Sequence, residues 1–104
     1  MTKEEKQFYS IGEEIKDSSQ GKLFGKPCFK INGKAFACFF EDAMVFKLTG
    51  DIYSAALGYD GSQLFDPSGK KRPMKEWVQI SYKHKDKWLT LANEAKKYVL
   101  SMQK

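Results

Sequence analysis

The two cysteines of the chain, Cys28 and Cys38, lie in one short stretch at residues 25–40, GKPCFKINGKAFACFF, which also carries three lysines and four phenylalanines. A thiolate next to a basic group is a nucleophile, and two adjacent thiols can form a disulfide or bind a metal ion. Disulfide and metal chemistry both require the two sulfur atoms to lie on the same side of the backbone. The local fold of this stretch therefore decides which reactions are open to it.

The pair Asn32-Gly33 stands between two runs of strand-forming residues. Asn-Gly favours a two-residue type I′ turn, because both turn positions need a positive φ angle. With this turn Cys28 pairs with Ala37, and the alternation of side chains along a strand sends Cys28 and Cys38 to opposite faces. We therefore predict that the thiols form neither a disulfide nor a metal site, and that each is a small buried hydrophobic side chain.

Other groups that could take part in catalysis are scattered. His84 is the only histidine, and no neighbour in the sequence orients it as a catalytic triad requires. The adjacent acidic pairs Glu13-Glu14 and Glu41-Asp42 are typical of solvated surface, and no glycine-rich phosphate-binding motif is present. We predict no catalytic residue, no metal ion and no cofactor, and hence a protein that is not an enzyme. A deep cleft holding a strongly perturbed Cys28 would revive the enzyme hypothesis.

Basic residues are concentrated in one part of the chain. The formal net charge is +5, and residues 70–87 account for all of it, because this segment has seven basic residues and two acidic ones, Glu76 and Asp86. This asymmetry is typical of a surface that binds nucleic acid, and the alternative is a solvated surface that maintains solubility. Tyr82 and Trp77 could stack on bases, although packing in the core is the better explanation of both. The candidate nucleic-acid-binding residues are Lys70, Lys71, Arg72, Lys75, Lys83, Lys85 and Lys87.

Hydrophobic periodicity gives the order of the secondary-structure elements. Thr2 can cap a helix over about residues 3–17, where Phe8, Ile11 and Ile15 recur at helical spacing. A short helix follows residue 49, and a long one begins at residue 85. The predicted strands cover residues 26–31, 34–40, 44–48, 62–66 and 76–82. The order α-β-β-β-α-β-β-α predicts one α+β domain over residues 1–104, with helices packed on a mainly antiparallel sheet.

Both faces of the central strands carry apolar side chains. With the predicted turn, one face has Phe29, Ile31, Phe36 and Phe40, and the other has Ala35, Ala37, Phe39, Met44 and Phe46. One helix cannot cover both faces, so either helices pack on both sides or a second subunit covers one of them. A symmetric homodimer is therefore one hypothesis, because isologous pairs are the commonest assembly.

The N-terminal sequence MTKEEKQFYSIGEEIKD has no apolar run, and no stretch approaches the roughly 20 apolar residues that span a bilayer. We expect a cytoplasmic protein without a membrane partner. In that reducing compartment a structural disulfide is rare.

Several motifs resemble the N-terminal domain of the TfoX/Sxy family and the related YjbR/MmcQ group. They are Phe24-Gly25, the hairpin Asn32-Gly33-Lys34, Asp42 before an apolar strand, and Arg72-Pro73-Met74-Lys75 before Trp77-Val78. The resemblance spans roughly residues 1–99. It departs at Lys26-Pro27, where family members often have glycine, and the second domain of the longer regulators has no counterpart in this sequence. It implies a secretion-chaperone-like α+β fold, a bacterial cytoplasmic location, a regulatory role such as that of the competence regulators, and no catalytic residues.

Two hypotheses about function remain open at this point. The first is a non-enzymatic regulatory domain that acts through nucleic acid or a transcription-linked regulatory protein, and the basic segment supports it. The second is a protein-interaction module, a homodimer or an adaptor, without nucleic-acid binding. The two apolar faces of the sheet support this second hypothesis, and a large exposed apolar patch would favour it.

Overall fold

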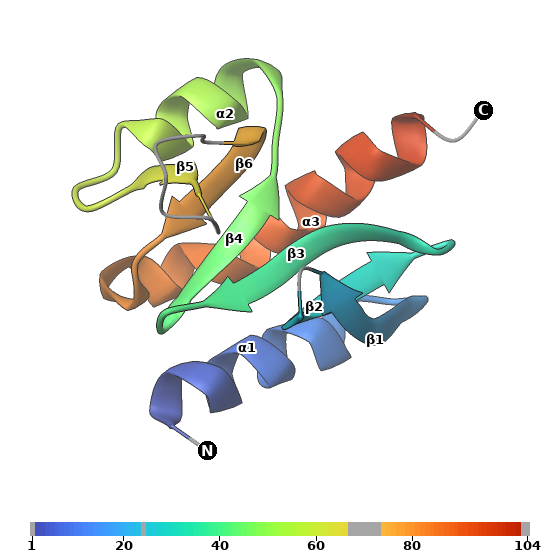
Figure 1. The fold of residues 1–104 in the computed structure, drawn as a ribbon. Helices are drawn as coiled ribbons and strands as arrows, with labels where there is room; N and C mark the ends of the chain where they lie inside the picture. Colours follow the sequence, from blue (N-terminus) through green and yellow to red (C-terminus); the bar gives the residue numbers. More distant parts are fainter. Residues whose placement is uncertain (1, 24, 67–73, 103–104) are drawn as a thin grey trace.

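The computed structural model describes residues 2–23, 25–66 and 74–102. Within these ranges the chain forms a six-stranded sheet and three α-helices, with a short 3-10 helix before the last of them (Figure 1). The helices are α1 (Lys3–Glu14), α2 (Gly50–Leu57), η1 (Tyr82–His84) and α3 (Lys85–Ser101). The strands are β1 (Ser18–Leu23), β2 (Lys26–Ile31), β3 (Lys34–Phe40), β4 (Ala43–Lys47), β5 (Gln63–Phe65) and β6 (Met74–Ile80).

The sheet has the strand order β1-β2-β3-β4-β6-β5, and every neighbouring pair is antiparallel. The predicted α+β class, with helices packed on a mainly antiparallel sheet, is therefore confirmed. The strand β1 is absent from the predicted order, in which residues 17–21 only break the first helix. Its sequence, SSQGKL, is polar and contains a glycine, as suits an edge strand with water beside it.

Local contacts fix both ends of α1. The Glu5 amide donates a hydrogen bond of 3.1 Å to the Thr2 hydroxyl, which is the cap that the sequence predicts. The helix ends at Glu14, before the predicted residue 17, because Ile15 adopts an extended conformation with φ −88° and ψ 112°. Asp17, with a φ angle of 67°, then turns the chain into β1. The Ser18 hydroxyl donates a 2.9 Å hydrogen bond to the carbonyl oxygen of Ile15 and so stabilises this reversal.

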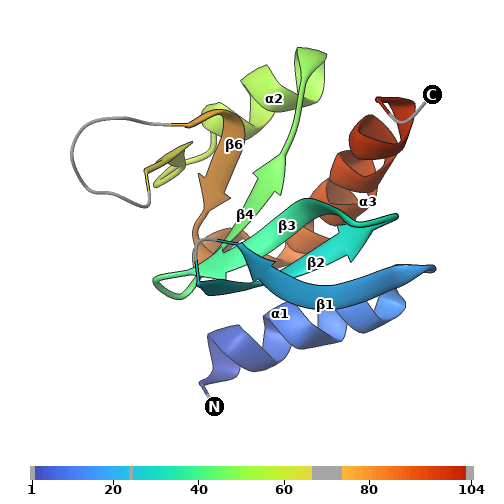
Figure 2. The same ribbon diagram turned by 45° about the vertical axis from the view of Figure 1, so that its right-hand side comes forward.

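Buried side chains form two separate clusters. The larger cluster contains residues of the sheet and of all three α-helices, among them Phe8, Ala56 and Trp88. The smaller cluster contains no helical residue and comprises Cys28, Cys38, Val45, Phe65 and Trp77. Figure 2 shows α3 passing behind β3 and β4, and α1 lying below β1 and β2. The helices therefore pack on one face of the sheet, and the smaller cluster occupies the other face.

Both faces of the sheet are apolar, as predicted, yet helices cover only one of them. Each of the five residues of the smaller cluster is at most 6% exposed in the single chain. These five side chains are therefore buried without a helix on this face and without a second subunit. The apolar residues packed against them are only partly buried, and they are Leu23, Ala35, Phe40 and Met74.

A β-bulge interrupts β3. Lys30 of β2 pairs with Ala35 of β3, but its neighbour Phe29 pairs with Ala37, so Phe36 is an extra residue in β3. Phe36 and Ala37 consequently both belong to the larger cluster, although they are adjacent in the chain. The strict alternation that the sequence analysis assumed along β3 ends at this point.

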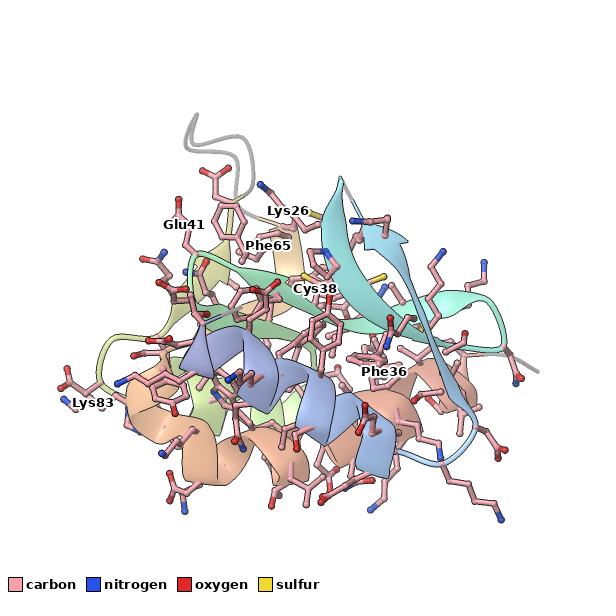
Figure 3. All side chains as sticks on the ribbon, turned by 90° about the horizontal axis from the view of Figure 1, so that it is seen from below. Lys26, Phe36, Cys38, Glu41, Phe65 and Lys83 are labelled. Carbon is pink, nitrogen blue, oxygen red and sulfur yellow. The ribbon has the colours of Figure 1, made fainter. Side chains whose placement is uncertain are left out.

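The predicted face assignment is therefore wrong for the second half of β3. Phe39 packs against the larger cluster, whereas Cys38 belongs to the smaller cluster and Phe40 packs against it. Figure 3 shows Phe36 on the side of the helices and Cys38 on the side of Phe65. The turn itself is as predicted, with positive φ angles of 51° and 81° at residues 32 and 33. The error lies in the bulge and not in the turn.

Candidate functional site

Cys28 and Cys38 lie directly opposite each other on β2 and β3, in the register that the bulge at Phe36 creates. The prediction that their thiols point to opposite faces is wrong, because it assumed an uninterrupted alternation along β3. Directly opposed residues on antiparallel strands have Cβ atoms about 4.5–5.5 Å apart, slightly farther than a disulfide requires. Both cysteines are free thiols in the structure.

The surroundings of the two thiols work against nucleophilic chemistry. Burial raises the pKa of Cys38 to about 12. Burial also raises the pKa of Cys28, and the charges of Lys30 and Lys22 offset only part of this effect. Both groups remain protonated at neutral pH, whereas the thiolate is the reactive form. The prediction that each cysteine is a small buried hydrophobic residue is confirmed.

The structure divides the basic segment. Three of its members lie outside the described residues: Lys70, Lys71 and Arg72. Lys75 is exposed near the start of β6, whereas Lys83, Lys85 and Lys87 are exposed beyond its far end, in η1 and the first turn of α3. A seven-residue strand is about 20 Å long, so Lys75 belongs to a different surface from the other three.

Tyr82 lies at the centre of the basic residues at the far end of β6. The Nζ atom of Lys85 lies 4.9 Å from the centroid of the Tyr82 ring and donates a 3.4 Å hydrogen bond to its hydroxyl oxygen. The Nζ atom of Lys3, at the start of α1, lies 5.6 Å from the same centroid. Lys87 is exposed two residues beyond Lys85. It lies about 200° around α3 from Lys85, so the two side chains do not share a face. We call Lys3, Tyr82 and Lys85 the Tyr82 surface.

Sequence reasoning missed Lys3 as a member of this surface. Lys3 is far from the basic segment in the chain, and the packing of α1 against α3 brings the two together. The cap at Thr2 places Lys3 in the first turn of α1. No local sequence pattern predicts that the start of α3 lies beside this turn.

Asp60 holds two other residues of this region in place. Lys83 Nζ forms an ion pair with the Asp60 carboxylate, and His84 Nε2 lies 2.8 Å from the Asp60 carbonyl oxygen. The hydrogen bond and the charge of Lys83 lower the pKa of Asp60. The His84 ring also contacts the ring of Tyr59, with centroids 5.2 Å apart. These contacts tie the loop after α2 to the start of α3, and they leave Lys83 less available to a ligand than Lys85.

The two aromatic residues of the basic segment differ in their surroundings. Trp77 is 6% exposed and belongs to the smaller cluster, so the prediction of core packing is confirmed for it. Tyr82 is half-buried, and its ring packs edge-on against Trp88 with centroids 5.6 Å apart. Tyr82 therefore contributes both to packing and to the surface beside the lysines.

A second candidate site is a hollow of about 420 Å³ between β3 and β4. The two strands pair only as far as Ala37 and Phe46, and beyond this pair they diverge in front of the C-terminal part of α3 (Figures 1 and 2). The lining residues come from four strands, from α3 and from the residue that follows α3, and they are Leu23, Lys34, Ala35, Lys47, Trp77, Val99 and Met102. We call this site the Trp77 hollow. Sequence reasoning missed it, because the divergence of two strands leaves no local pattern.

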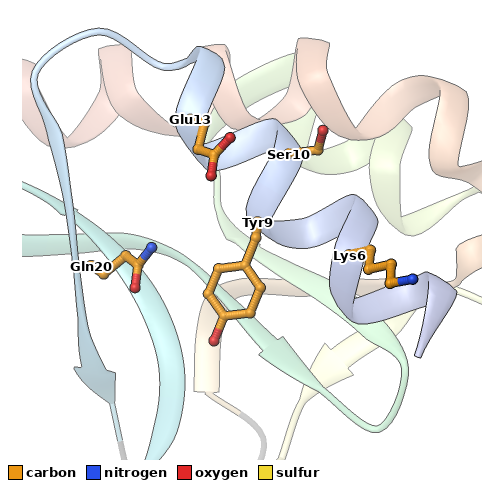
Figure 4. Close-up of a pocket in the computed structure, with 5 residues that line it drawn as sticks. All are labelled: Lys6, Tyr9, Ser10, Glu13 and Gln20. Carbon is orange, nitrogen blue, oxygen red and sulfur yellow. The ribbon is translucent and has the colours of Figure 1, made fainter. Parts of the chain in front are cut away.

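A more open hollow of about 460 Å³ lies between α1 and β1 (Figure 4). Its lining residues are Lys6, Tyr9, Ser10, Glu13 and Gln20. One cation and one anion line it, so the side chains favour neither an anionic nor a cationic ligand.

The described residues contain no group of three or more His, Cys, Asp and Glu side chains that could hold a metal ion. None of the helices within the described ranges has the length and apolar character needed to cross a membrane. Comparisons of the chain with protein-family models, with curated proteins and with solved structures gave no match.

Proposed function

We propose that this chain is a non-catalytic regulatory domain that binds nucleic acid through the Tyr82 surface. The observation that carries the proposal is the approach of two lysine amines, those of Lys3 and Lys85, to the ring of Tyr82. Neither amine is in an ion pair, since the salt bridges among the described residues are Lys83–Asp60 and Lys97–Glu94. Two ammonium groups without an ion pair, beside one aromatic ring, are donors suited to a backbone phosphate.

These charges contribute little to the stability of the folded protein. An exposed cation–π contact stabilises by about 0.5–1 kcal/mol. Lys85 and Lys87 lie in the first turn of α3, where the helix dipole disfavours each positive charge by about 0.3–1 kcal/mol. Asp86 in the same turn is favourably placed and offsets one of these charges. The contributions nearly cancel, so a phosphate partner accounts for the arrangement better than stability does.

The state of the cysteines supports a non-catalytic role. Their pKa values are raised by burial, so both side chains of the most nucleophilic type in the chain are held in their unreactive form. The resemblance to the TfoX/Sxy N-terminal domain supports a regulatory role linked to transcription and a bacterial cytoplasmic location. Those two parts of the proposal depend on the resemblance alone.

The alternative is a protein-interaction module without nucleic-acid binding. It is supported by Leu100 and Met102, which are 38% and 49% exposed at the end of α3. Two side chains on one helix form a small patch compared with the apolar patches that mark protein interfaces. We therefore prefer nucleic acid as the partner.

A salt series tests the proposal directly. Fluorescence anisotropy with a short labelled DNA duplex, and with a single strand of the same length, gives the binding constant at each salt concentration. The slope of log K against log salt is about −0.9 for each phosphate contact on a duplex and about −0.7 on a single strand. One phosphate contact for each of the amines of Lys3 and Lys85 contributes a slope of about −1.8 on the duplex. A slope near zero, or no binding at low salt, would contradict nucleic-acid binding.

A further inference from the structure

The Trp77 hollow combines apolar walls with a positively charged rim. Its apolar lining residues are Leu23, Ala35, Trp77, Val99 and Met102. The two remaining lining residues are Lys34, which is exposed, and Lys47, which is half-buried. The Nζ atom of Lys47 lies 5.6 Å from the centroid of the Trp77 ring, so this amine is held beside the apolar wall. A ligand that fills the hollow meets an apolar surface and an ammonium group at once.

Among the described residues that line or adjoin the hollow, positive charge exceeds negative charge. Neither Lys34 nor Lys47 takes part in the ion pairs formed among the described residues. The acidic residue next to Trp77 is Glu76, and its carboxylate accepts a hydrogen bond from the Tyr98 hydroxyl. The C-terminal end of α3 adds a partial negative charge of about one half. The two ammonium groups outweigh these contributions, so the hollow favours an anionic group over a cationic one.

The size and depth of the hollow indicate a small ligand. A volume of about 420 Å³ falls in the range of pockets that hold small molecules. Trp77 is 6% exposed, so its ring lies below the surface, where the flat face of a partner protein does not reach. An aromatic ligand can pack against this ring, while its charged group remains near the lysines at the rim.

We propose that the Trp77 hollow binds a small carboxylate with an aromatic body, an arylalkanoate, whose carboxylate lies between Lys34 and Lys47. This site is independent of the Tyr82 surface. Lys85 is the first residue of α3, whereas Val99 is near its end, and a helix of 17 residues is about 25 Å long. Binding in the hollow therefore goes beyond the proposed nucleic-acid binding and does not depend on it.

The test uses 3-phenylpropionate and its neutral amide as matched probes. The two molecules have the same aromatic body and differ in charge. The side-chain N–H signals of Trp77 and Trp88 in proton–nitrogen NMR spectra give a local readout, because Trp88 belongs to the other cluster. The Trp77→Phe variant assigns the two signals. The test variant is Lys34→Gln/Lys47→Gln, and the control with the same change in charge is Lys16→Gln/Lys22→Gln, at exposed lysines that do not line the hollow.

We expect 3-phenylpropionate to shift the Trp77 signal with a Kd on the order of 1 mM, and the amide to bind about tenfold more weakly. The Lys34→Gln/Lys47→Gln variant should lose this preference, and the control should keep it. Equal binding of acid and amide would overturn the assignment of an anion site. If neither probe shifts the Trp77 signal, the hollow is not a binding site. If the control variant loses the preference for the acid as fully as the test variant does, that preference comes from the overall charge of the protein and not from Lys34 and Lys47. The DNA salt series is unaffected by any of these results, so the two proposals fail separately.

Discussion

Cys28 lies directly opposite Cys38 across β2 and β3, and both side chains are buried in the smaller cluster. The pair exists because the bulge at Phe36 shifts the register of β3 by one residue. Adjacent thiols usually suggest redox or metal chemistry, but burial raises the pKa of both groups here. The result is a pair of thiols that acts as part of a core.

The first prediction concerns the accessibility of these thiols. Native protein at pH 8 should react very slowly with a thiol reagent such as dithionitrobenzoate, because the side chains of Cys28 and Cys38 are at most 1% exposed. Protein unfolded in guanidinium chloride should release two equivalents of the coloured product at once. Rapid reaction of either thiol in the native protein would show that the smaller cluster opens readily.

The second prediction concerns stability at high pH. The folded protein keeps the Cys38 proton until about pH 12, whereas the unfolded chain loses it near the ordinary thiol pKa of 9.0. The unfolded state then binds fewer protons, so the free energy of unfolding falls between pH 9 and pH 12. This group alone contributes a slope of about 1.4 kcal/mol per pH unit.

Urea titrations of wild type and Cys38→Ala at several pH values check this slope. The difference between the two proteins removes the contribution of lysines, which titrate in the same range. We expect Cys38→Ala to be less stable at pH 8, and its deficit to shrink as the pH approaches 12. Parallel stability curves for the two proteins would show that the thiol is not held protonated by the fold.

The third prediction concerns Gly12, which lies in α1 against the ring of Phe29. A Cβ atom at residue 12 would lie 1.9 Å from Cζ of Phe29, so alanine forces the ring or the helix to move. We expect Gly12→Ala to lower the free energy of unfolding by about 1–3 kcal/mol, despite the better helix propensity of alanine.

The exposed residue Ser10, on the same helix, provides the control for this change. Ser10→Ala should alter stability by no more than about 0.5 kcal/mol. The Gly12→Ala penalty should also be smaller in a Phe29→Leu background, since the side chain that clashes is then shorter. Equal effects of Gly12→Ala and Ser10→Ala in urea titrations would refute the close packing of α1 on β2.

The fourth prediction concerns oligomeric state. The smaller cluster is buried within a single chain. Among the described residues, the exposed large hydrophobic side chains are those of Leu100 and Met102. A stable dimer interface buries on the order of 1,000 Å² or more, which two side chains do not supply. Light scattering at high protein concentration should give the mass of one chain. A mass of two chains would restore the homodimer hypothesis.

The sequence predicts the fold class well where the local signals are strong. Thr2 begins α1 as expected, and the turn at Asn32-Gly33 has the positive φ angles that its residue types favour. The strand β1 escapes prediction, because its polar residues show no alternation and its position is fixed only by pairing with β2.

The bulge in β3 shows why the candidate site was harder to predict than the fold. Both faces of β3 are apolar, so Phe36 and Ala37 fit either face equally well from the sequence alone. Only the packing of both residues against the helices decides the register, and that register places Cys38 opposite Cys28. The same is true of Lys3, whose contact with Tyr82 depends on how α1 packs against α3.

The salt dependence of DNA binding by Lys3→Gln/Lys85→Gln is the most direct test of the proposed function. The matched control is Lys16→Gln/Lys22→Gln, which removes the same charge at exposed lysines away from Tyr82. We predict that the Lys3→Gln/Lys85→Gln slope on the duplex is less steep than that of wild type by about 1.8, and that the control slope is unchanged. Equal slopes for the two variants would contradict binding through the Tyr82 surface.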